Sequence, residues 1–263
     1  LSLTFVSGAG WAGATYAVWS PLVVGPGETR AFANVLAGFF AAAKGSWGVV
    51  LVRGDDVPVP PVIVSRTYNA ASADVAGTFG LSVPAISVAN GVKPQSAAGG
   101  NFLAGLRHDD AFRTNLTVAN LKDEASEVEV VFRDGAGNVL GSPAKITVEG
   151  RGVKQLNGAL SAAVASATDP IGGAGYGSPA SQFSAEVRIK SGSGVYPYAT
   201  VIDQGTGDSI VVTPAATPSP TYRLPGIVRV LGGSGAYWVS DVALLNPTAS
   251  PRKINVTFSY EKL

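Results

Sequence analysis

The side chains best suited to catalysis or metal binding lie together in one short run, Arg107-His-Asp-Asp110. His108 is the only histidine of the 263 residues, and two carboxylates follow it directly. Such a pairing could supply the base of a Ser-His-Asp site or hold a metal ion. The run falls between two predicted strands, however, and the matching stretch of a later repeat, residues 233–236, has neither histidine nor acid. We therefore interpret it as a loop, and no converging acid, base and nucleophile predicts an enzyme.

Two further runs resemble known ligand motifs. Arg53-Gly-Asp55 is the tripeptide of integrin ligands, and the acids from Asp203 to Asp208 have the spacing of half a calcium loop. Gly-Asp is ordinary turn chemistry, and the second run lacks the further acids and the distal glutamate of a full calcium loop. We interpret both as turns, with adhesion and calcium as the lesser alternatives, and we expect no cofactor and no metal.

Aromatic side chains offer a different kind of surface. Trp11, Tyr16 and Trp19 lie in a predicted hairpin of the first repeat only. Such a row of rings could stack on sugars or seal a contact with a neighbouring subunit, and packing in the core is the default interpretation. Asn115 and Asn255 begin glycosylation sequons, but both fall in predicted strands, and tripeptides of this kind arise often by chance.

The elements that carry these residues are predicted to be mostly β-strands. Residues 127–133 alternate clearly, so that Val128, Val130 and Phe132 share one face and Val131 lies on the other. Short helices are predicted at 32–43 and 156–165, and Pro197 suits an edge strand because proline cannot donate to a ladder. About seven strands in about 120 residues are typical of a β-sandwich. The other predicted strands are 102–106, 112–118, 144–148, 183–189, 196–202 and 209–213.

One segment occurs three times. Phe5, Phe132 and Phe258 close three versions of the same strand, and they lie 127 and then 126 residues apart. A period of about 126 residues is the length of a domain, so the chain holds two periods and a short overlap. Both ends of the sequence fall inside a repeat, which predicts an end-to-end assembly rather than a ligand pocket.

The repeat can be followed along the chain. Residues 47–66 match 184–203 without gaps at an offset of 137, and residues 112–120 match 238–246 at an offset of 126. The offset changes only where Gly, Ser, Ala and Pro gather, as expected for loops inserted on a common scaffold. A third match has an offset of 124 and pairs Arg30, Phe32 and Leu36 with Lys154, Leu156 and Leu160.

Composition excludes several classes of function. Hydrophobic residues make up 46% of the chain, charged residues 14%, and the net charge is +1, so no basic field for nucleic acid is present. There is no cysteine, which excludes disulfides and thiolate chemistry and fits an extracellular protein, although cytosolic proteins can lack it too. The longest apolar stretch is far shorter than the roughly 20 residues of a membrane-spanning helix, so we expect no membrane insertion.

The motif around the best-matched strand resembles a known kind of protein. The run from Phe112 to Asn120 and the run from Trp238 to Pro247 are similar to a pattern in tandem repeats of secreted bacterial surface and filament proteins. There an aromatic-x-Thr/Ser-Asp/Asn strand leads into Asn-Pro and an alternating strand. The resemblance implies immunoglobulin-like β-sandwich repeats and an extracellular location, and it assigns no activity. The expected fold is all-β, with tandem immunoglobulin-like sandwiches of period about 126 residues and one short helix each.

Three segments follow from this template. Residues 1–92 are expected to form a sandwich that lacks its opening strands, 96–216 a complete sandwich, and 220–263 the opening strands of a further repeat. A half sandwich exposes an apolar face and strand edges, so we expect the last segment to complete a neighbouring unit. Phe5 and Phe258 occupy the same repeat position; either one strand pairs as an extra edge, or the sequence is an overlapping window of a longer tandem array. The expected inter-unit contacts are Trp238, Val242, Leu244, Val256 and Phe258.

The sequence therefore predicts a structural subunit of an extracellular filament or surface fibre, whose main partner is a further copy of itself. The first alternative is an adhesin or stalk in which tandem sandwiches act as spacers. The second is a carbohydrate-binding module of a secreted protein, which would use the aromatic side chains of the first repeat.

Overall fold

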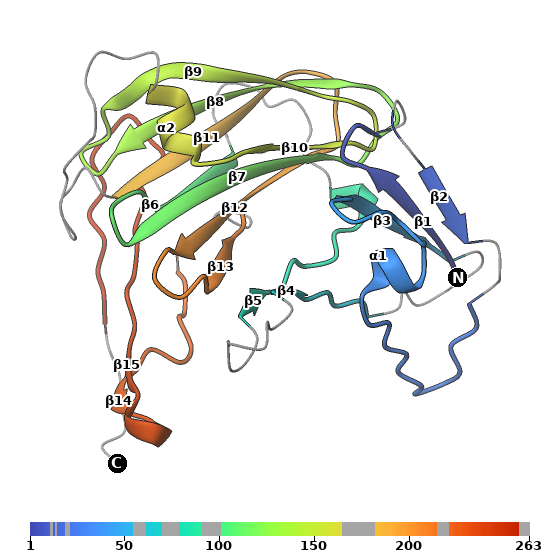
Figure 1. Cartoon of the computed structure of the whole chain (residues 1–263). Helices are drawn as coiled ribbons and strands as arrows, with labels where there is room; N and C mark the ends of the chain where they lie inside the picture. Colours follow the sequence, from blue (N-terminus) through green and yellow to red (C-terminus); the bar gives the residue numbers. More distant parts are fainter. Residues whose placement is uncertain are drawn as a thin grey trace. The chain divides into compact units, whose positions relative to one another are not determined.

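The computed structural model is all-β, as predicted: most of its elements are antiparallel strands, and helix is confined to short segments (Figure 1). The chain divides into two units, residues 1–218 and residues 219–263. No helix in the part of the chain that the structure describes is long and apolar enough to cross a bilayer. The structure describes residues 1–10, 13, 15–18, 22–54, 62–69, 79–90, 101–164, 182–214 and 221–257.

The first four-stranded sheet has the strand order β6-β11-β8-β9. Its strands are β6 (Asn101–Arg107), β11 (Gln182–Ser191), β8 (Ser126–Asp134) and β9 (Val139–Val148). The alternation predicted for residues 127–133 is confirmed, since Val128, Val130 and Phe132 are all buried. Val131 on the opposite face is buried as well.

The second four-stranded sheet has the order β10-β7-β12-β13. It contains β10 (Val153–Leu156), β7 (Phe112–Asn120), β12 (Val195–Asp203) and β13 (Ser209–Val212). Pro197 lies in β12 opposite Val118, and β13 pairs with β12 only from Ala199 onward. β12 is an inner strand of the sheet, but among the described residues no strand pairs with it at Pro197 on the side away from β7, which is compatible with a residue that has no N–H to donate.

These two sheets share one hydrophobic core and form a sandwich-like pair of layers (Figure 1). Leu103 and Leu106 come from β6, Leu116 and Val118 from β7, and all four side chains are fully buried. Leu160 from the short helix α2 (Ala159–Val164) joins the same core. Strands of opposite sheets are thus held together by side chains that alternate along each strand.

A smaller sheet lies at the start of the chain, with the order β2-β1-β3. Its strands are β1 (Ser2–Ser7), β2 (Thr15–Val18) and β3 (Gly48–Arg53). Phe5 is buried against Phe40, with a ring-centroid distance of 5.9 Å. Later in the chain, β4 (Thr67–Tyr68) pairs with β5 (Gly80–Leu81), and a 3₁₀ turn covers Val88–Asn90.

The helix predicted at residues 32–43 is much shorter in the structure. Only α1 (Val35–Gly38) is helical. Asn34 before it and Ala41 after it have φ values of 44° and 51°, a left-handed conformation that interrupts a helix. The run of small and aromatic residues that was predicted as a helix therefore forms a single helical turn, and the residues around it pack on the core of the β1–β3 sheet.

The second unit contains little regular structure in its described residues. A hairpin pairs β14 (Arg229–Leu231) with β15 (Tyr237–Val239) through the 3₁₀ turn Gly233–Gly235. The strand predicted to end at Phe258 is not formed at residues 254–257, and Phe258 itself lies outside the described residues. The apolar side chains of this unit consequently have few partners of their own.

Candidate functional site

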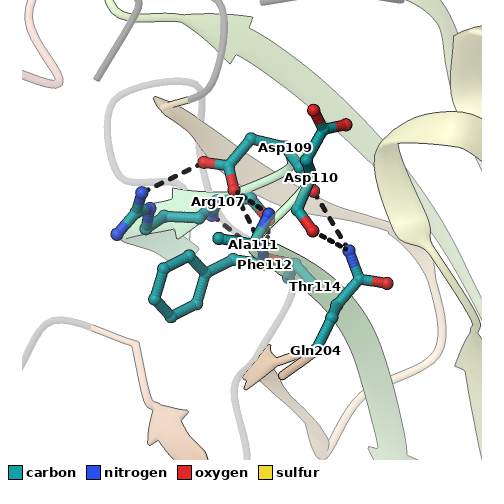
Figure 2. A network of polar contacts seen from close by, with 7 residues as sticks. All are labelled: Arg107, Asp109, Asp110, Ala111, Phe112, Thr114 and Gln204. Atoms are coloured by element: carbon teal, nitrogen blue, oxygen red, sulfur yellow. Dashed lines mark hydrogen bonds and ion pairs between the residues drawn. The ribbon is translucent and has the colours of Figure 1, made fainter. Parts of the chain in front are cut away.

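The loop around His108 is built as a structural corner between β6 and β7 (Figure 2). The Asp109 carboxylate accepts hydrogen bonds from the N–H groups of Ala111 and Phe112, at 2.9 and 2.8 Å. It also accepts one from the Arg107 guanidinium at 3.0 Å, and its side chain is 1% exposed. A carboxylate used in this way closes a tight turn, which supports the interpretation of the run as a loop.

Arg107 and Gln204 extend the corner to neighbouring strands. The Arg107 guanidinium lies 3.9 Å from the centroid of the Phe112 ring, a cation–π contact, and its backbone exchanges two hydrogen bonds with the Thr114 hydroxyl. The Gln204 amide donates to the backbone carbonyls of Asp109 and Asp110, at 3.1 and 3.3 Å (Figure 2). The corner thereby fastens the β6–β7 turn to the β12–β13 turn.

His108 has one polar neighbour that the sequence did not reveal. Its Nε2 lies 3.1 Å from the Oγ of Ser161, on α2. Its Nδ1 is buried and has no hydrogen-bond partner within the described part of the chain. A serine–histidine pair needs a third group on Nδ1 to fix the tautomer, and the nearest acid in sequence, Asp109, is bonded to Arg107 and the turn instead. No pattern in the sequence brings residues 53 positions apart together, so only the docking of α2 could show this contact.

The acids at Asp203–Asp208 form a hairpin turn, as predicted. Asp203 accepts hydrogen bonds from the N–H groups of Thr206 and Gly205, and these bonds lower the pKa of its carboxyl group. The carboxylate thus bonds to its own turn. No cluster of three or more potential metal ligands occurs among the residues that the structure describes.

Other predicted site residues lie on described strands or outside the described residues. Asn115 is buried and its side-chain oxygen accepts the Gly158 N–H at 3.0 Å, so its amide is not accessible to a glycan in the folded protein. Arg53 ends β3, and Tyr16 lies in β2 with its side chain undescribed. The rest, Trp11, Trp19 and Asp55, lie outside the described residues.

Many of the exposed large apolar side chains of the described chain lie in the second unit. Val242 is 51% exposed and Leu244 63%, although the residues matched to them in sequence, Leu116 and Val118, are both 0% exposed. Trp238 is also exposed, at 60%. The full set is Tyr222, Leu224, Ile227, Val228, Val230, Leu231, Tyr237, Trp238, Val239, Val242, Leu244, Ile254 and Val256. Exposed apolar side chains in this number make the segment a candidate interaction surface.

A complementary exposure occurs in residues 62–66 of the first unit. Val62 is 96% exposed and Val64 83%, whereas their sequence matches Ala199 and Val201 are 0% and 3% exposed. Ala199 and Val201 belong to the core between the two sheets, and β7 pairs alongside them in β12, with Leu116 and Thr114 opposite. Val62 and Val64 belong to no strand. The candidate site is therefore a pair of surfaces, each of which exposes what its counterpart in the sandwich buries.

Comparison with known proteins identifies no relative: no family model, no curated protein and no solved structure matches the chain.

Proposed function

We propose that this protein is the structural subunit of an extracellular filament or surface fibre. Its units are immunoglobulin-like repeats with a period of about 126 residues, joined head to tail by strand complementation or as a continuous tandem array. The observation that carries the proposal is the paired exposure: Val62 and Val242 are 96% and 51% exposed, and their matches Ala199 and Leu116 lie opposite each other with no exposure.

Strand order supports the proposed repeat. The smaller sheet at the start of the chain has the order β2-β1-β3, and the corresponding strands of the complete sandwich have the order β9-β8-β11. Phe5 pairs with Val50, and its match Phe132 pairs with Ala185. At the offset of 137 residues, Val50 corresponds to Val187, so the two registers differ by two residues and keep the same faces inward. In the complete sandwich β6 continues the sheet beyond β11; in the described residues of the first unit, β3 pairs with β1 alone.

Composition supports an extracellular, self-associating protein over an enzyme. The chain lacks cysteine, which fits an extracellular location. Only 14% of its residues are charged, so contacts between its copies would be largely apolar. An apolar joint should survive about 1 M salt, where the Debye length is about 3 Å. The carbohydrate-binding alternative relies on aromatic residues that include Trp11 and Trp19, which lie outside the described residues. The stalk alternative shares the tandem sandwiches and differs in making them spacers.

A matched pair of substitutions tests the proposal. Val242 and Val139 are 51% and 50% exposed, but only Val242 belongs to the proposed joint. Val242→Asp should weaken association by about 3 kcal/mol or more, roughly a hundredfold, because it would bury an unpaired charge. Val139→Asp should leave association unchanged. Sedimentation velocity and negative-stain microscopy report the outcome. Wild-type protein that remains monomeric at high concentration, or Val242→Asp fibres of normal length, would refute strand complementation between separate chains.

A further inference from the structure

In the complete sandwich, β7 is a central strand with a neighbour on each side. Leu116 of β7 lies opposite Leu156 of β10 on one side and opposite Ala199 of β12 on the other. Both backbone edges of β7 are thus paired, and Leu116 is 0% exposed. The strand that corresponds to β7 in another repeat should therefore need two flanking strands rather than one.

The first repeat has both flanks in its described residues. Phe32 matches Leu156, and Val62 matches Ala199. Phe32 is 40% exposed and Val62 96% exposed, and the runs 29–32 and 62–66 that contain them belong to no strand. The counterparts of the residues that flank β7 in the sandwich are thus exposed, and within the described residues neither run belongs to a sheet.

The second unit has a segment with the properties of a central strand. Residues 237–246 contain no proline, so each residue can donate to a ladder, and Pro247 follows directly. Val242 and Leu244 lie at the positions of Leu116 and Val118, which face the sandwich core. Trp238 takes the position of Phe112, which packs against the same core.

We propose that residues 237–246 of a second copy insert as a central strand between residues 29–32 and 62–66, with Val242 opposite both Phe32 and Val62. The same register places Ser240 opposite Val64, as Thr114 lies opposite Val201, and Leu244 opposite Arg30, as Val118 lies opposite Lys154. This inference rests on the proposed function, and it adds the partner segment, its position and its register.

The occupied position of β1 limits how far the insertion extends. Phe5 is 1% exposed and β1 is paired on both sides, with β2 and with β3. The slot that a strand ending at Phe258 would take is therefore already filled. The inserted segment ends near Asn246, and Val256 stays outside the joint.

Disulfide trapping in the full chain tests the register, since the protein has no cysteine of its own. Residues directly opposite in an antiparallel pair have Cα atoms about 4.5–5.5 Å apart, within the range that a disulfide spans. Two mixtures of single variants are oxidised: Val62→Cys with Val242→Cys, and Phe32→Cys with Val242→Cys. One partner carries a mass tag, so that only bonds between different chains are scored. The control is Val62→Cys with Ala243→Cys, because a shift of one residue points the side chain to the other face.

The expected result is a tagged heterodimer in both mixtures, at least tenfold more abundant than in the control mixture. Equal yields in the control would overturn the register. Assembly of the wild-type chain without either cross-link would overturn the inference and leave the proposed function standing. Absence of both assembly and cross-links would overturn the inference together with the proposal that separate chains join by strand complementation. The double variant Val62→Cys/Val242→Cys in one chain adds a last test, because a bond confined to single chains would show that each chain closes on itself and has no second copy as partner.

Discussion

Asn120 and Asn246 close two separate loops with the same pattern of hydrogen bonds. Each side-chain amide donates to the carbonyl oxygen four residues later, at 2.7 Å to Glu124 and at 2.8 Å to Ser250. Each side-chain oxygen accepts the N–H two residues later, from Lys122 at 3.0 Å and from Thr248 at 3.1 Å. Sequence matches the two asparagines at an offset of 126 residues, so local geometry and sequence pattern agree. The difference is that Asn120 is fully buried and Asn246 is exposed.

The two asparagines should therefore respond differently to the same substitution. Asn120→Ala removes the two loop bonds and a third bond to the Val148 carbonyl in β9, and it leaves buried groups unpaired. We expect it to lower the free energy of unfolding by about 2–3 kcal/mol in urea denaturation. Asn246→Ala should leave the unfolding midpoint unchanged and weaken association in sedimentation. Equal effects of both variants on unfolding would contradict the view that only Asn120 is built into a finished sandwich.

The corner at Asp109 gives a second prediction, on stability rather than catalysis. Asp109→Ala removes three hydrogen bonds from a carboxylate that is 1% exposed and leaves Arg107 without that partner. We expect the free energy of unfolding to fall by about 2–3 kcal/mol. His108→Ala removes one exposed contact with Ser161 and should change it by less than about 1 kcal/mol. The reverse order would show that the imidazole, and not the carboxylate, organises the loop.

Two turn carboxylates predict the acid response. Burial raises the pKa of Asp134, but hydrogen bonds from Asn138, Ala136 and Gly137 outweigh it and lower the pKa below its ordinary value. Hydrogen bonds from Thr206 and Gly205 likewise lower the pKa of Asp203. A folded-state pKa below the unfolded value contributes stability above the unfolded pKa, and this is lost as the pH falls through the folded pKa. Stability should therefore decline below about pH 4. In Asp134→Asn, urea midpoints measured from pH 5 to pH 2 should decline less steeply than in wild type; an unchanged slope would contradict the assignment.

Alternating strands were the part of the fold that sequence could predict. The strand at residues 127–133 has one apolar face and one largely charged face, and a turn with Asp and Gly follows it at residues 134–138, so local pattern and tertiary environment agree. β10 was not predicted, because four residues with Lys154 and Gln155 in the middle carry too little apolar pattern. β9 begins at Val139, five residues before the predicted start, since pairing with β8 recruits a stretch of Gly, Ser and Pro.

The candidate site also has a part that sequence could predict and a part that depends on tertiary contacts. Repeat matching predicted Val242 and Leu244 as apolar positions of a strand, and their exposure is what the structure adds. The sequence match of residues 47–66 with 184–203 aligns Val62 and Val64 with Ala199 and Val201, but only the structure shows that the first pair is exposed and the second buried. Ser161 beside His108 could not be predicted, because the contact depends on how α2 docks and not on any local pattern.

The central sandwich should fold without the rest of the chain. Its core takes side chains from both four-stranded sheets, whereas the first repeat has a small core of Leu3, Phe5, Phe40 and Ala42 with mostly half-buried neighbours. A fragment of residues 96–216 should melt cooperatively as a monomer when followed by circular dichroism. A fragment of residues 1–92 should be disordered or insoluble. A soluble, cooperatively melting 1–92 fragment would contradict the proposed division of the chain.

Val256 separates two versions of the joint. Sequence matching alone predicts that Val256 and Phe258 enter the neighbouring unit, so that Val256→Asp would abolish assembly. Insertion that ends near Asn246 predicts instead that Val256→Asp assembles normally, because β1 already occupies that slot through Phe5. Val256 is 79% exposed in the free chain, so the charge should not disturb the isolated fold, and equal thermal melts of variant and wild type would verify this. Sedimentation velocity then decides: normal association with Val256→Asp and lost association with Val242→Asp supports the central-strand joint. Loss of association in both variants would mean that the donated segment displaces β1 and extends to the third copy of the repeated strand.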